Sequence, residues 1–441
     1  MLERVRRYLG GMTWAILVAM LALMASSLIA IRAAEVAEPA PTGHFARQAA
    51  FVGVALAAFF VTTLIPYHRI GRWAWVWYGL NLALLVLVFF LRPVRGSHRW
   101  IDLKIFNLQP SELMKVSYVI ALAWYLRYRE SYRRLRGLAA PLLLTLVPAA
   151  LILKEPDLGT TLLLLPTLGL MLFMAGARLK HLLATLAVAA AVVFVPVPRP
   201  LSDGEAAQAE SLAYGTVALG GKRYSLRALP LTLMHGHQLR RIEGWLKQSD
   251  EDVAMDESYQ LQQSLMILGS GGARGMGGDK GLMHHFRMLP DDHTDFIFAI
   301  IGGRGGLIAC LGVMLLYLAI FICGSEIASL TKDPFGRLLA IGVLSLLFVQ
   351  IFINIGMTMG VMPITGMTLP LISYGGSSMV VNGIALGLLV NVGQRRPISL
   401  GRKPFDHDAK SPEDQADVSR PLPQVDWPRK TWGGPAPADR Q

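Results

Sequence analysis

The sequence predicts an all-α integral membrane protein with ten membrane-spanning helices. Of its 441 residues, 53% are hydrophobic and only 16% are charged, whereas a soluble protein carries about 25% charged residues. Uncharged runs recur along the chain, and several reach the roughly 20 residues that a helix needs to cross a bilayer. Backbone groups in such runs find no water to bond, so the helix is the conformation expected for them. These observations argue against a cytosolic enzyme.

The uncharged runs define the spans in order. The first follows a basic N-terminus, as a signal peptide would, but it is longer than the usual apolar core of about 7–15 residues, so we expect a retained span. Pro363, Gly366 and Pro370 divide the uncharged stretch 338–394 into two helices. The expected spans are 12–31, 48–67, 73–91, 110–126, 137–153, 158–177, 182–197, 296–323 and the two halves of 338–394.

Lys and Arg gather at alternate ends of these spans. Basic residues follow every even-numbered run, and Arg4, Arg6 and Arg7 precede the first. Because positive residues are retained on the cytoplasmic side, both termini are expected there. The net charge of +12 partly reflects this topology. Its placement at helix ends argues against a nucleic-acid partner.

The chain divides into a membrane domain and two polar ends. Residues 1–11 form the expected cytoplasmic N-terminus, 12–397 the membrane domain, and 398–441 a polar, proline-rich tail predicted to be disordered. Residues 198–294 form an extracytoplasmic loop between the seventh and eighth helices, far longer than a normal connector. Cys310 and Cys323 lie on one expected helix, too far apart to form a disulfide with each other.

Ionisable residues in or beside the spans are costly and mark candidate functional sites. A first cluster holds Arg99 and Trp100, followed by Glu112 and Lys115. Glu112 and Lys115 are three residues apart on one helix, so they can pair with each other. Trp100 alone is also typical of an interfacial residue. A second cluster, KEPDLGT, contains Asp157, which either caps a helix or meets Lys115 across the bundle.

Three further clusters follow. A glycine run with Ser270 and Arg274 could surround a phosphate with backbone N–H groups, but it lacks the Lys-Ser/Thr end of a nucleotide-binding loop. The segment LPDDHTDFIF sets His293 and Asp295 at the membrane edge, where Asp295 could act as a general base, cap the helix or join a metal site. Small residues within 354–378 permit close packing or a broken helix at a binding site.

Together, these five segments resemble the SEDS family, the RodA, FtsW and SpoVE proteins of bacterial cell-wall synthesis. Their order and spacing match over about residues 12–394, and PITGMTLP is more similar to the RodA and SpoVE branches than to FtsW. The matching segments are RWIDLKIFNLQPSELMK, KEPDLGTTLLL, YQLQQSLMILGSGGARGMG, LPDDHTDFIFAIIG and INIGMTMGVMPITGMTLPLISYGGSSMV.

The resemblance implies a peptidoglycan glycosyltransferase of the bacterial cytoplasmic membrane. Such an enzyme polymerises lipid II at the outer face, for cell elongation, shape or division, together with a class B penicillin-binding protein. By position, Asp295 matches the family's essential carboxylate, and Trp100, Glu112, Lys115 and Asp157 match other residues linked to activity.

The leaving group in that reaction is a lipid pyrophosphate, whose charge needs cations or a metal. Arg99, Arg240, Arg241 and Arg274 are available on the outer side. Family members respond to divalent cations, so Mg²⁺ or Mn²⁺ is a candidate cofactor, but the sequence defines no ligand set. His293 beside Asp295 is the supporting residue closest to the expected base.

One departure from the family bears on this expectation. Gly302, Gly303 and Arg304 stand where relatives usually carry Gly-Glu-Glu, so we expect Arg304 either to pair with Glu112 or Asp157 or to face a watery cavity. The missing acids leave a non-catalytic scaffold for a penicillin-binding protein as an alternative. A lipid II flippase is another, but it requires a polar path across the bilayer, and the inner halves of most spans lack charge.

Overall fold

The computed structural model describes most of the membrane domain. Predictions for the N-terminal residues, the tail 398–441 and His293 lie outside the described residues. The described residues are 11–37, 43–91, 99–102, 107–129, 131–155, 157–193, 196–200, 215–219, 222–228, 241, 244–245, 259–276 and 294–395.

The first half of the chain is a series of helices at seven of the expected spans. Pro110 occupies the first turn of one helix, where its missing N–H costs nothing. The Asp157 carboxylate caps another by accepting a hydrogen bond from the Thr160 amide. The elements are α2 (Gly11–Ala37), α3 (His44–Leu64), α4 (Tyr67–Arg72), α5 (Ala74–Val88), α6 (Pro110–Leu126), η1 (Ser131–Arg133), η2 (Leu135–Leu138), α7 (Ala139–Lys154), α8 (Leu158–Met174) and α9 (Leu179–Val193).

The second half contributes the longest helices. Asp333 precedes one of them, and its carboxylate accepts a hydrogen bond from the Gly336 amide at 2.8 Å. The chain leaves the helical conformation between Thr358 and Gly376, where the prolines and glycines predict a break. The helices are α12 (Tyr259–Ser270), α14 (Ile297–Leu330), α15 (Pro334–Thr358) and α16 (Gly376–Arg395).

The expectation of an all-α protein is wrong in two places. A short hairpin pairs β1 (Ile101–Asp102) with β2 (Asn107–Leu108) directly before α6. The loop 198–294 and the residues just before it contribute a three-stranded antiparallel sheet in the order β3-β5-β4, formed by β3 (Pro196–Pro200), β4 (Gly215–Leu219) and β5 (Lys222–Ala228). In β5, Tyr224, Leu226 and Ala228 alternate with Arg223, Ser225 and Arg227, a period-2 pattern that suits a strand and contains no apolar helical run.

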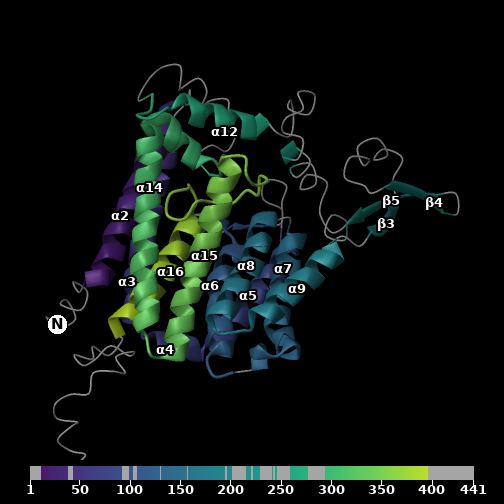
Figure 1. The fold of residues 1–441 in the computed structure, drawn as a ribbon. Coiled ribbons are helices and arrows are strands. Elements are labelled where there is room, and N and C mark those ends of the chain that lie inside the picture. Colours follow the sequence, from purple (N-terminus) through teal and green to yellow (C-terminus); the bar gives the residue numbers. More distant parts are fainter. Residues whose placement is uncertain are drawn as a thin grey trace, which may run out of the picture. The chain divides into compact units, whose positions relative to one another are not determined.

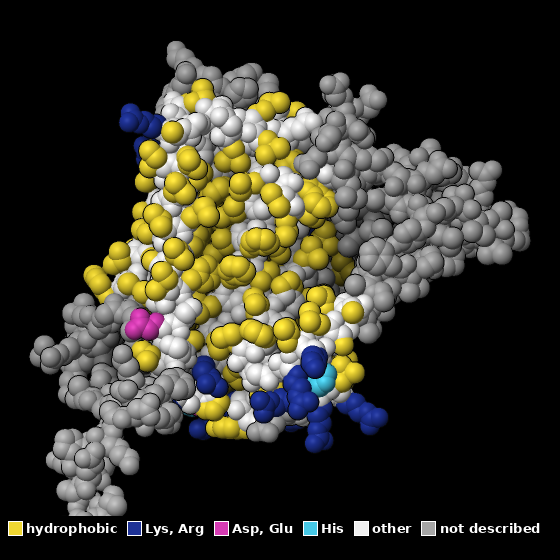
Figure 2. All heavy atoms as spheres, viewed as in Figure 1, with side chains coloured by type: hydrophobic (Ala, Val, Ile, Leu, Met, Phe, Trp, Pro, Cys, Tyr) yellow, Lys and Arg dark blue, Asp and Glu magenta, His cyan; other side chains and the backbone are white. Residues whose placement is uncertain are grey.

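The described helices make the chain a multi-pass membrane protein. Six helical segments are long and apolar enough to cross a membrane. The other four expected spans occur as the shorter helices α5, α6, α8 and α9, each 15 or 17 residues long. Figure 2 shows hydrophobic side chains over the middle of one face and Lys and Arg gathered toward one end of it, where α4 lies in Figure 1.

Helices α15 and α16 form the interior of the bundle. Of the 18 residues that form the apolar stretch of each helix, 78% are buried in α15 and 83% in α16, against 22% in α3. Helix α16 packs on α3, α15 and α6, and α15 packs on α14, α8 and α6. Figure 1 shows α14, α15 and α16 side by side, with α12 across the end at which α14 begins. The polar residues of α15 are therefore surrounded by protein.

Candidate active site

The segment between α15 and α16 returns into the bundle and is held there by buried amides of α15. Gln350 Nε2 donates to the Thr368 carbonyl at 2.8 Å, and Asn354 Nδ2 donates to the Met367 carbonyl. The Tyr317 hydroxyl of α14 donates to the Pro370 carbonyl. Non-helical backbone at membrane depth is tolerated when protein groups satisfy it in this way. For this segment the sequence predicts either close packing by small residues or a broken helix. The chain is non-helical here, and the side-chain amides of Gln350 and Asn354 hold its backbone.

Asp295 lies at this end of the bundle, two residues before α14 begins. Its backbone carbonyl accepts a hydrogen bond from Asn354 Nδ2 at 3.0 Å, which ties it to α15. Gly366, in the returning segment, has a φ of +72° and presents its bare Cα to the site. A Cβ there would lie 3.2 Å from Arg241 Nη1 and 3.5 Å from Asp295 Oδ2. The carboxylate and a guanidinium thus border the same small space.

Arg99 joins this group from the segment before β1. Its Nε donates to the Glu155 carbonyl at 2.9 Å. Burial lowers the pKa of the Arg99 guanidinium, while the carboxylates of Asp157, Asp295 and Glu155 act in the opposite direction. Arg241 also lowers this pKa because it is a second cation within range. Two arginines and three acids from five segments therefore share one electrostatic environment.

Asp157 is a satisfied helix cap and does not meet Lys115. Its side chain is 5% exposed. Oδ2 accepts hydrogen bonds from Gln109, Ser111 and the Thr160 hydroxyl, each at 2.9 Å, and Oδ1 accepts from the Thr160 amide at 3.1 Å. The predicted contact between Lys115 and Asp157 is wrong, because four donors on α6, α8 and the residue before α6 already fill the carboxylate.

Lys115 pairs instead with Glu112, the neighbour one turn earlier. The ammonium lies 2.8 Å from both carboxylate oxygens and 3.3 Å from Gln350 Oε1. Lys115 is only 2% exposed, so this pair is separated from water. Removal of either member would leave an uncompensated charge inside the bundle. Gln350 connects the pair to the returning segment.

Glu155 is an acid whose importance the sequence analysis missed. Glu155 directly follows the last residue of α7 and is 0% exposed. Neither of its carboxylate oxygens accepts a hydrogen bond from the described residues. Desolvation, reinforced by the nearby Asp157 carboxylate, raises the pKa of Glu155 from 4.5 to about 9, although Arg99 opposes the shift. Glu155 is therefore neutral at physiological pH. The sequence signal that could have pointed to Glu155 is the pair of acids, Glu155 and Asp157, on either side of Pro156.

The glycine run packs into a break in α14. Gly306 has a φ of +66° and interrupts the helix. The Met276 amide donates to the Gly303 carbonyl, and the carbonyls of Gly272 and Ala273 accept from the Leu307 and Ile308 amides, at 2.9–3.2 Å. These bonds replace those that the break removes, and they occupy the Met276 amide and the carbonyls of Gly272 and Ala273.

The remaining predicted site residues are placed as follows. Trp100 is half-buried next to Arg99, at the start of the β1–β2 hairpin. Arg274 is exposed on the turn after α12, where it makes no contact of its own to the group around Arg99. His293 lies outside the described residues. Arg240 does as well, whereas Arg241 of the same loop borders the space beside Gly366 together with Asp295.

Arg304 does not take the partner expected for it. Glu112 is paired with Lys115, and Asp157 is filled by four donors. Arg304 is exposed on α14 and lines a groove against α2, whose other lining residues are mostly apolar. The predicted pairing of Arg304 with Glu112 or Asp157 is therefore wrong, and the alternative of a watery cavity stays a prediction.

A metal site has no defined ligands in this part of the chain. Among the described residues, no three side chains of His, Cys, Asp or Glu converge as a metal site would require. His293, which the sequence sets beside Asp295, lies outside the described range, as do Asp291 and Asp292 of the same segment. Mg²⁺ or Mn²⁺ therefore stays a prediction, and we assign no step to it.

Comparison with known proteins identifies the family. The sequence model of the FtsW, RodA and SpoVE proteins, described as cell cycle protein, matches residues 8–397. The chain belongs to the FtsW/RodA/SpoVE family. The RodA peptidoglycan glycosyltransferase of Treponema pallidum is 32% identical over 80% of this chain and 90% of its own length. Stage V sporulation protein E of Bacillus subtilis is 31% identical over 78% of this chain and 86% of its own length.

Solved structures agree with the family assignment. A structure of a peptidoglycan synthase complex, described as coordinating polymerization and crosslinking, contains a chain with a TM-score of 0.68 and 26% identity, covering 87% of this chain and 98% of that chain. The RodA crystal structure from Thermus thermophilus gives a TM-score of 0.59 at 25% identity, covering 87% of this chain and 97% of that chain. The bundle described above is thus the architecture of the FtsW/RodA/SpoVE family.

The buried pair of Glu112 and Lys115 predicts strong coupling. Lys115→Met should lower the free energy of unfolding by about 3–5 kcal/mol, because Glu112 is left buried without its cation. Adding Glu112→Leu should recover most of that loss, as measured by folded yield and melting temperature in detergent. Asp157→Asn combined with Lys115→Met is the matched control and should be additive, since these residues do not touch. Additive losses for Glu112 and Lys115 would contradict the pairing.

The neutral state of Glu155 predicts a pH-dependent stability. Between pH 4.5 and about 9 the folded state holds a proton that the unfolded state lacks. Stability therefore falls as the pH rises through this window, by at most about 1.4 kcal/mol per pH unit. Glu155→Gln cannot titrate, so it should melt at a higher temperature than wild type at pH 8 and at a similar temperature near pH 4.5. An equal difference at both pH values would show that Glu155 ionises normally.

The bare Cα of Gly366 predicts a specific loss of activity. Gly366→Ala introduces strain at a positive φ and also a methyl group beside Arg241 and Asp295. Gly43→Ala is the matched control, because its φ is +70° and a Cβ there meets no atom within 4 Å. Both variants should lose about 1–2 kcal/mol of stability, but only Gly366→Ala should also lose at least tenfold in turnover, measured as glycan formed per folded protein. Equal activities would place the reactive space elsewhere.

Proposed function

We propose that this chain is a peptidoglycan glycosyltransferase that polymerises lipid II at the outer face of the bacterial cytoplasmic membrane. The observation that carries the proposal is the pair of Asp295 and Arg241 beside Gly366, with Arg99 in the same electrostatic environment, in a chain of the FtsW/RodA/SpoVE family. The relatives named peptidoglycan glycosyltransferase support the same activity.

The reaction needs a base and cations, and this group supplies both types of residue. The Asp295 carboxylate takes the proton of the acceptor sugar's 4-hydroxyl, whose oxygen then bonds to the anomeric carbon of the donor. The bond from that carbon to the pyrophosphate breaks, and the electron pair leaves with the lipid pyrophosphate. Arg99 and Arg241 offset the negative charge that develops there. Neutral Glu155 leaves more of this positive charge available than an ionised carboxylate would.

The membrane arrangement in this proposal has ten spans and two cytoplasmic termini. Helices α5, α6, α8 and α9 would complete the six longer spans. Arg69, Arg72 and Arg337 lie at the end of the bundle opposite Asp295, as a cytoplasmic face requires. The loop 198–294 would then be extracytoplasmic, on the side of the substrate.

A class B penicillin-binding protein is the proposed partner. The structural relative belongs to a complex that coordinates polymerization and crosslinking. Crosslinking consumes the glycan strands that polymerization makes, so a transpeptidase is the partner expected for a polymerase. We make no assignment between elongation and division, because the relatives named RodA and FtsW are each 32% identical to this chain.

Replacement of Asp295 tests the proposal. Asp295→Asn should abolish glycan formation from labelled lipid II, because the amide cannot accept the proton. It should still fold, since the Asp295 backbone carbonyl is what binds Asn354. The control is Asp102→Asn, which removes an exposed carboxylate on β1 that does not border the space beside Gly366. The assay uses purified protein in liposomes, with and without the penicillin-binding protein.

The outcomes separate the candidate functions. Polymer from wild type and Asp102→Asn but not from Asp295→Asn supports the proposal. Polymer from Asp295→Asn at a near wild-type rate would remove Asp295 as the base. Translocation of lipid II by wild type without polymer would indicate a flippase. If wild type shows neither polymerisation nor translocation, a scaffold is indicated.

A further inference from the structure

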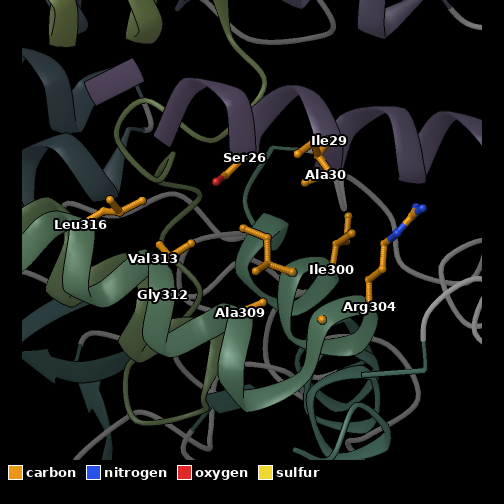
Figure 3. A pocket seen from close by; sticks show the side chains of 11 residues that line it. Ser26, Ile29, Ala30, Ile300, Arg304, Ala309, Gly312, Val313 and Leu316 are labelled. Carbon is orange, nitrogen blue, oxygen red and sulfur yellow. The ribbon is translucent and has the colours of Figure 1, made fainter. Parts of the chain in front are cut away.

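A lateral groove runs between α2 and α14 on the side of the bundle. It has a volume of about 710 Å³. Figure 3 shows Ile29 and Ala30 of α2 facing Ile300, Ala309 and Val313 of α14 across it. Its lining is apolar except for Ser26 and Arg304, and the Ser26 hydroxyl is occupied by the Ala22 carbonyl of its own helix at 2.9 Å.

The groove exists because α14 is broken and carries small residues there. The break at Gly306 displaces the first turns of α14 from the rest of the helix. Gly305, Ala309 and Gly312 then leave the space beside α2 without side chains to fill it. A Cβ added at Gly312 would meet no atom within 4 Å. Among the described residues, no group closes the space at this point.

Arg304 places a positive charge at one end of the groove. It lies seven residues into α14, about 10 Å along the axis from the helix start. Figure 3 shows its side chain extending past Ile300, at the opposite end from Leu316. Within the described part of the chain, no acidic residue forms an ion pair with it. A cation at that depth in a bilayer is costly unless it reaches an anion at the headgroup level.

We propose that this groove binds an anionic glycerophospholipid, with one acyl chain along α2 and α14 and its headgroup phosphate on Arg304. The lining is apolar along its length and cationic at one end only, which is the complement of an amphiphile with an anionic head. The bidentate geometry of a guanidinium suits a phosphate. A lipid bound there would bridge α2 and the turns of α14 that lead to Asp295.

Binding of defined lipids to delipidated protein tests this site. Phosphatidylglycerol should raise the melting temperature and be retained in native mass spectra, and it should bind more tightly than phosphatidylcholine. Arg304→Gln should weaken phosphatidylglycerol binding about tenfold or more, the loss expected for one hydrogen bond to a charged group. Gly312→Leu should block both lipids, because Gly312 lines the groove and a Cβ there meets no atom within 4 Å, so the added side chain takes up groove volume.

The matched control is Gly53→Leu on α3. Gly53 is also exposed on a helix with no atom within 4 Å of an added Cβ, but it lies outside the groove. This variant should bind both lipids as wild type does. Unchanged phosphatidylglycerol binding in Gly312→Leu would overturn the proposal, and so would binding of a polyprenyl phosphate in place of the phospholipid. If Arg304→Gln fails to fold, Gly312→Leu against Gly53→Leu decides the question.

Discussion

Backbone that leaves a helix inside an apolar bundle needs hydrogen-bond partners from the protein, because lipid offers none. Between α15 and α16 this requirement is met by the amides of Gln350 and Asn354, which bond to the carbonyls of Thr368 and Met367. The same amides contact the charged residues of the site, since Gln350 accepts from Lys115 and Asn354 donates to the Asp295 carbonyl. Satisfying one irregular segment thus fixes both the buried ion pair and the reactive carboxylate.

The charges at this end of the bundle are compensated in different ways. Lys115 and Glu112 neutralise each other, Asp157 is stabilised by four hydrogen bonds, and Glu155 avoids charge by keeping its proton. The carboxylates of Asp157 and Asp295 both act on Arg99, and Arg241 adds a second guanidinium group beside it. Among the described residues, these two guanidinium groups supply the positive charge that an anionic ligand such as a lipid pyrophosphate needs.

The break in α14 links two features that the sequence presents separately. Gly306 interrupts the helix, and the backbone of Gly272 to Met276 takes over the lost hydrogen bonds. A Cβ on Gly271 would lie 2.1 Å from the Gly302 carbonyl oxygen, so this approach requires glycine. The same break opens the groove that Arg304 lines. Glycine-rich stretches that resemble a ligand loop can therefore serve to repair a helix.

The sequence by itself determined the membrane class, the positions of the helices and the break within 338–394, because long uncharged runs and prolines act locally. It also indicated Asp295 as the acid at the start of α14 and allowed the pairing of Glu112 with Lys115 one turn apart. Only the tertiary structure decided that Asp157 accepts hydrogen bonds from Gln109, Ser111 and Thr160, that Glu155 is neutral, and that Arg241 and Asp295 border the same space beside Gly366. Those outcomes depend on burial and on which segments meet across the bundle. Neither is encoded in the spacing of residues along one helix.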